Sequence, residues 1–152
     1  MEIDTKLLVL MLVFGIIESY SVSAIPLMIF FIDISSILLM YISSFFLPAI
    51  NIAMNIIIFA VIYSIGKGVN LKAKLKSVVV SLSVGCFLGS LIGYSAYVVI
   101  PFFKGASWYS GLLDFFLAVV HVLLTSLEIS LGLFFVSFTA LALAYFRVNN
   151  NS

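Results

Sequence analysis

Charged residues are scarce in this sequence. Of its 152 residues, 7 are Lys or Arg and 6 are Asp or Glu, so 9% are charged while 64% are hydrophobic. A soluble globular domain has about 25% charged and about 45–50% apolar residues. Too little charge is present to cover a soluble surface, which excludes a soluble domain, a disordered chain and a nucleic-acid-binding protein. The composition indicates an integral membrane protein, and we expect no nucleic acid among its partners.

Cysteine and histidine are also rare, since Cys86 and His121 are the only residues of their kinds. A single cysteine cannot form a disulfide within the chain, and one histidine with one cysteine cannot build a zinc site. The sequence contains neither a phosphate-binding glycine loop nor a GxSxG nucleophile elbow. We therefore predict no catalytic residue, no metal and no cofactor, and we expect that the protein is not an enzyme.

Long apolar runs divide the chain into four segments. A helix needs about 20 apolar residues to cross the hydrocarbon core of a bilayer. The runs predict an all-α fold in which four transmembrane helices pack as a bundle in one membrane domain, with spans near residues 7–32, 38–65, 77–103 and 117–146. A basic cytoplasmic loop at 66–76 and a short outer loop at 104–111 are expected to connect them. The second and fourth runs exceed one crossing, so residues 34–45 and 111–120 are either interfacial helices or extensions of these spans.

The distribution of basic residues predicts the orientation, because Lys and Arg near span ends favour the cytoplasmic side. With four spans, both termini and the 66–76 loop share one side. That side holds Lys6, Lys67, Lys72, Lys74, Lys76 and Arg147, while the other holds only Lys104. We therefore expect a multi-pass protein of the cell membrane with both termini in the cytoplasm. The lysines of the loop are expected to set this topology and to contact anionic head groups of the lipid bilayer; they are Lys67, Lys72, Lys74 and Lys76.

Small residues recur every four positions along the third apolar run. This series consists of Ser77, Ser81, Gly85, Gly89 and Gly93. In lipid, small residues let two helix backbones approach closely and gain dispersion contacts. The series predicts tight helix packing, either against another helix of the same chain or in an oligomer interface.

Ionisable and amide side chains inside the apolar runs are the candidate site. Glu18 lies about 16 Å along the first span, and an intramembrane carboxylate usually faces the bundle interior. Seven-residue spacing places Asp114, His121 and Glu128 in one stripe on the fourth span. Asn51 and Asn55 lie one turn apart on the second span. These six residues form either a proton or ion site or hydrogen-bonded contacts between helices, and we expect Glu18 to meet His121 or an Asn.

Two functions are open at this point. The first is an accessory or assembly subunit of a larger membrane complex, with other membrane subunits as its partners. The second is a minimal proton- or ion-coupled transporter or channel that acts as a homo-oligomer. We favour the first, because most of the polar residues have adequate structural explanations.

Overall fold

The computed structural model is all-helical in the part of the chain that it describes, residues 3–31, 37–103 and 112–150. Its four helices are α1 (Thr5–Phe31), α2 (Ile37–Gly66), α3 (Leu71–Phe103) and α4 (Leu112–Asn150). Each contains a stretch long and apolar enough to cross a membrane. The four long apolar helices pack together, which confirms the predicted all-α class and is compatible with a multi-pass membrane protein.

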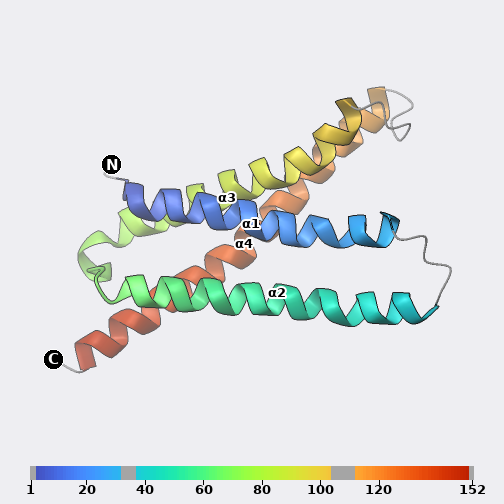
Figure 1. Cartoon of the computed structure of the whole chain (residues 1–152). Coiled ribbons are helices and arrows are strands. Elements are labelled where there is room, and N and C mark those ends of the chain that lie inside the picture. Colours follow the sequence, from blue (N-terminus) through green and yellow to red (C-terminus); the bar gives the residue numbers. More distant parts are fainter. Residues whose placement is uncertain (1–2, 32–36, 104–111, 151–152) are drawn as a thin grey trace.

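The helices are arranged so that three chain segments meet at one end of the bundle. Figure 1 shows the start of α1, the connection from α2 to α3 and the end of α4 on the same side. A hydrogen bond links two of these segments, since Nη1 of Arg147 donates to the Tyr63 hydroxyl at 3.2 Å. Lys6, Lys67, Lys72, Lys74 and Lys76 lie on the described segments at this end. We call it the basic end; Lys104 is outside the described residues.

The first turns of α3 lie within the segment that the sequence predicted as a loop. The Asn70 side-chain oxygen accepts a hydrogen bond from the backbone N–H of Ala73 at 3.1 Å, as an N-cap residue does. The helix begins at Leu71, although Lys74 has non-helical backbone angles (φ −115°, ψ 17°). Apolar runs reveal only the part of a helix that needs an apolar environment, so this lysine-rich helix start could not be seen from hydropathy.

The two long apolar runs form continuous helices over their described residues. Residues 112–150 form a single helix of 39 residues, so residues 112–120 extend the fourth span and do not form a separate element. The second helix begins at Ile37, so the part of the 34–45 segment from that residue onward is also an extension of its span. Residues 34–36 lie outside the described residues.

Close packing of α1 against α3 organises the bundle, and glycines make it possible. The two helices run in parallel. A Cβ atom on Gly85 would lie 2.7 Å from the Leu8 carbonyl oxygen, and one on Gly93 would lie 2.7 Å from Cβ of Ser19. A Cβ on Gly89 would meet the Leu12 carbonyl and the backbone of Gly15. The small-residue face of α3 therefore lies against α1 of the same chain.

Serines continue this contact toward the basic end. The backbone N–H of Asp4 donates to the Ser81 hydroxyl at 2.9 Å. Ser81 is buried, whereas Ser77, one turn earlier, is half-buried. Beside this contact, the fully buried core consists of apolar side chains from all four helices, among them Met11, Ile58, Ile62, Leu82, Leu133 and Leu141.

Candidate functional site

Glu18 is buried between helices. Its side chain is only 5% exposed. The side-chain amides of Asn51 and Asn55, both on α2, donate to its Oε1 atom at 3.2 and 3.0 Å. One turn of helix separates the two asparagines, so both amides reach the same oxygen. The structure therefore brings three of the six candidate residues together and joins α1 to α2 through them.

The asparagine pair is held by hydrogen bonds of its own. The Asn55 amide nitrogen also lies 2.9 Å from the Asn51 carbonyl oxygen and 3.0 Å from its Oδ1 atom. The other carboxyl oxygen of Glu18, Oε2, is buried and has no hydrogen-bond partner among the described residues. We call Glu18, Asn51 and Asn55 the carboxyl–amide cluster. It is a compact interhelical contact with one unsatisfied oxygen.

An open groove runs beside the cluster along α2 and α4. Its volume is about 410 Å³. Asn51 and Asn55 contribute the polar part of its lining, and the remaining side chains are apolar: Ile52, Ile56, Phe59 and Val136. Both asparagines are half-buried, so the cluster lies between the packed interior and this groove.

His121 and Glu128 do not join the cluster. Both are exposed, and Asp114 is half-buried. Nε2 of His121 lies 3.0 Å from the Tyr94 hydroxyl, so the histidine is paired with α3 and not with Glu18. Of the two partners predicted for Glu18, the asparagines are the ones it meets.

The rotation of α4 explains why the stripe faces outward. The helix packs through a second set of residues at helical spacing, Ser126, Ser130, Leu133, Ser137 and Ala140, all of which are buried. Glu128 lies two residues from both Ser126 and Ser130. At about 100° per residue, it points roughly 200° away from them, to the opposite side of the helix.

A shared hydrogen-bond acceptor fixes the depth of Glu128. The Ser90 carbonyl oxygen accepts from the hydroxyl of Ser19 at 3.1 Å and from that of Ser126 at 3.5 Å. Glu18 is the neighbour of Ser19, and Glu128 follows Ser126 by two residues, or about 3 Å of helix rise. The exposed Glu128 and the buried Glu18 therefore lie at nearly the same level of the bundle.

Sequence reasoning missed the buried serines and Tyr94. Ser90, Ser126, Ser130 and Ser137 lie in the helix contacts. The spacing of four and seven between the three serines of α4 was the available signal, because it marks one helix face. Serine is frequent in this chain, and the Asp114–His121–Glu128 stripe follows an equally regular spacing, so sequence alone did not separate the packed face from the outer one.

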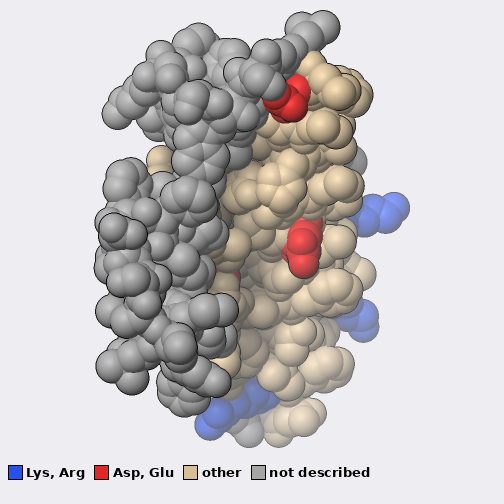
Figure 2. Space-filling view, turned by 90° about the vertical axis from the view of Figure 1, so that its right-hand side faces the viewer, with Lys and Arg blue, Asp and Glu red and all other residues tan. Residues whose placement is uncertain are grey.

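The surface adds two observations. On the face seen in Figure 2, acidic side chains stand within an uncharged surface and the basic side chains lie toward its margins. Among the described residues, no group of three His, Cys, Asp or Glu side chains could hold a metal ion.

No protein-family model, curated protein or solved structure matches the chain. Only the geometry of the chain itself therefore bears on the function of the site.

Proposed function

We propose that this protein is a four-span subunit of a larger membrane complex, and that the outer face of α4 binds a helix of another membrane protein. The observation that carries the proposal is the exposed position of Glu128 at the level of the buried Glu18. Four helices of sufficient length and apolarity support the membrane location. The concentration of Lys and Arg at the basic end supports a cytoplasmic location for that end.

The cost of an exposed carboxyl group in lipid is the physical argument. Placing a charged side chain at the centre of a transmembrane helix costs about 2.5–3.5 kcal/mol on insertion scales. No hydrogen bond or ion pair of Glu128 is found within the described residues. Such a group normally faces other protein or a water-filled cavity. A partner helix that covers α4 would remove this cost.

The partner's chemistry follows from the carboxyl group. Its helix should offer a hydrogen-bond donor, such as an Asn, Ser, His or Lys side chain, at the level of Glu128. Beside Glu128 on the outer surface, a Cβ added to Gly132 would meet no atom within 4 Å, so the partner's backbone has room to approach there. A second copy packed through a parallel twofold contact of α4 would bring Glu128 against Glu128, which offers no complementary charge.

A proton or ion transporter is the alternative, and the placement of the polar residues favours it less. The carboxyl–amide cluster is closed by the two asparagine amides, while His121 and Glu128 lie on the outer face. A proton relay needs groups that hydrogen-bond in succession. Among the described residues, Glu18 has hydrogen bonds to the asparagines alone.

The first test is the mass of the native assembly. We expect the tagged protein, extracted in mild detergent, to give a stoichiometric complex with a different membrane protein in native mass spectrometry. Glu128→Leu should reduce the recovered complex at least tenfold, because it removes the group that the partner pairs with. The same substitution should leave the isolated chain equally stable or more stable, since an exposed carboxyl is lost from lipid.

A matched variant separates this effect from general damage. Ser83 is an exposed polar residue of α3, so Ser83→Leu makes a similar polar-to-leucine change elsewhere on the surface and should leave the complex intact. Equal losses from Ser83→Leu and Glu128→Leu would contradict the proposal. A complex made only of copies of this chain would also contradict it and would favour the transporter.

The orientation is tested separately by cysteine labelling. In a Cys86→Ala background, Lys72→Cys should react with a membrane-impermeant maleimide only when the cytoplasmic side is open. Ser107→Cys, in the predicted outer loop, should react in intact cells. Labelling of both positions from the same side would overturn the four-span topology.

A further inference from the structure

A cavity lies at the basic end, between the starts of α1 and α3. Its volume is about 960 Å³. Four lysines and one aspartate are part of its lining, a net formal charge of +3: Lys6, Lys72, Lys74, Lys76 and Asp4. The proposed contact between α4 and a partner helix does not involve this cavity.

A kink at Lys74 lies among the lysines of α3. Lys72 and Lys76 flank the kink at Lys74, whose backbone angles are non-helical, so helical spacing does not fix the direction in which each lysine points. Ser77 and Ser81 are one turn apart in the regular helix that follows Lys74, so they share one face. Since Ser81 accepts the hydrogen bond from the Asp4 backbone, this face is the one directed at α1.

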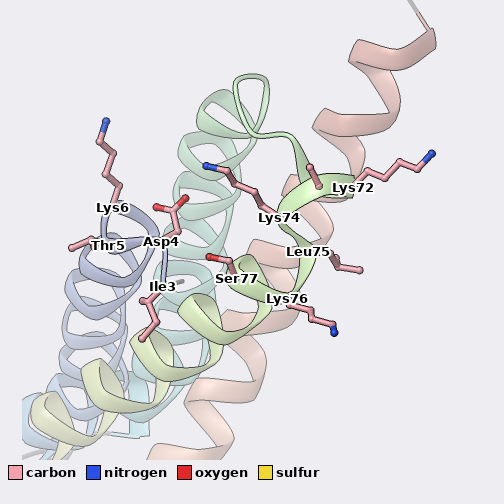
Figure 3. Close-up of a pocket in the computed structure, with 10 residues that line it drawn as sticks. Ile3, Asp4, Thr5, Lys6, Lys72, Lys74, Leu75, Lys76 and Ser77 are labelled. Atoms are coloured by element: carbon pink, nitrogen blue, oxygen red, sulfur yellow. The ribbon is translucent and has the colours of Figure 1, made fainter. Parts of the chain in front are cut away.

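Figure 3 shows the directions of these side chains. Lys74 and Ser77 point toward the start of α1, where Asp4 and Lys6 lie, whereas Lys72 and Lys76 point away from it. Ser77 lines the cavity and directs its hydroxyl toward α1, whereas the Thr5 side chain points away from α3. The Asp4 carboxylate is engaged at the helix start, where Oδ1 accepts from the backbone N–H of Leu7 at 3.3 Å. Two lysines, Lys6 and Lys74, and the hydroxyl of Ser77 therefore border one cavity.

We propose that Lys6, Lys74 and Ser77 bind a phosphate group, and that the phosphate is the head group of an anionic phospholipid. Ammonium and hydroxyl groups donate hydrogen bonds to phosphate oxygens, and the ammonium groups neutralise the phosphate charge. The lipid source follows from location. The membrane-crossing stretches of α1 and α3 begin at Thr5 and Leu71, so the cavity opens where a bilayer's head groups would lie. Basic residues at this level attract anionic lipids.

The test measures binding of single lipids to the purified protein by native mass spectrometry. We expect the first phosphatidylglycerol to bind more tightly than phosphatidylcholine. The double variant Lys6→Gln/Lys74→Gln should weaken phosphatidylglycerol binding by about thirty-fold, from about 1 kcal/mol for each lysine near the head groups. All the substituted side chains lie at the surface, so the variant should remain folded, and circular dichroism checks this.

A control with the same loss of charge makes the test specific. Lys67 and Arg147 lie at the basic end but do not line this cavity. Lys67→Gln/Arg147→Gln should therefore weaken binding by less than threefold. Equal weakening by the two double variants, or no preference of the wild-type protein for phosphatidylglycerol, would overturn the site in favour of diffuse attraction by surface charge.

Inorganic phosphate distinguishes the two sources of a phosphate group. If the ligand is a lipid, millimolar phosphate at constant ionic strength should not displace bound phosphatidylglycerol, since the acyl chains add to the affinity. Displacement that depends on Lys6 and Lys74 would assign the cavity to free phosphate and overturn the lipid assignment.

Discussion

Gly89→Ala should destabilise the protein by about 3 kcal/mol, near the upper end of the range for overpacked positions. The added Cβ would meet the Leu12 carbonyl and the backbone of Gly15 on α1. A side chain can rotate out of a clash, but a backbone carbonyl in a helix moves only with the whole helix. The α1–α3 contact would have to open along its length, and dispersion contacts on both sides would be lost. The free energy of unfolding, measured by SDS titration in mixed micelles, reports the effect.

The matched control is the same substitution at Gly132. This glycine is exposed on α4, and an added Cβ would meet nothing within 4 Å. Because alanine is favoured over glycine inside a helix by about 1 kcal/mol, Gly132→Ala should leave the isolated chain equally stable or slightly more stable. If Gly89→Ala were also neutral, α1 and α3 could not be packed as closely as the structure has them.

Asn55→Leu should give the second large effect, a destabilisation of about 1–3 kcal/mol. It removes the shorter of the two hydrogen bonds to Oε1 of Glu18, at 3.0 Å. In the wild-type protein Glu18 is only 5% exposed, so water cannot replace the lost donor without disturbing the contact between α1 and α2. The carboxyl group then keeps only the Asn51 donor, at 3.2 Å, and the loss of its second donor carries a desolvation penalty. The same SDS titration measures this change in the free energy of unfolding.

The double variant Glu18→Leu/Asn55→Leu tests whether the loss comes from the pair. Removing Glu18 together with Asn55 leaves no buried carboxyl group short of a donor, and the remaining Asn51 is half-buried beside the groove. The double variant should therefore be more stable than the sum of the single effects predicts, by about 0.5–3 kcal/mol. If the two single effects simply add, the contribution of Glu18 to stability does not depend on Asn55.

In proteoliposomes, Glu18→Gln should change no proton flux above background. Loss of a measurable flux would instead support the transporter.

Hydropathy predicted much of the fold, because a helix that lies in an apolar environment consists of a long run of apolar residues. Four apolar runs gave four helices, and the four-residue series ending in Gly93 indicated close packing. The series did not identify its partner. That choice depended on Gly15, Leu12 and Ser19 of α1, which offer a complementary surface to α3 only after the two helices are aligned in parallel.

The candidate site was only partly predictable, because spacing shows which residues share a helix face but not what that face contacts. Seven-residue spacing placed Asp114, His121 and Glu128 on one face of a helix, and this is a property of the helix alone. Which way that face turns depends on how Ser126, Ser130 and Ser137 pack against the neighbouring helices.

The sequence by itself therefore determined the helical class, the helix number, the side on which basic residues gather and the choice of Glu18 as a buried polar residue. Only the tertiary structure decided that Glu18 meets Asn51 and Asn55, that Glu128 faces outward at the same level, and that Lys74 separates from Lys72 and Lys76 to face α1. Composition and periodicity are properties of one segment, whereas contacts between helices depend on the rotation, depth and direction of two segments together.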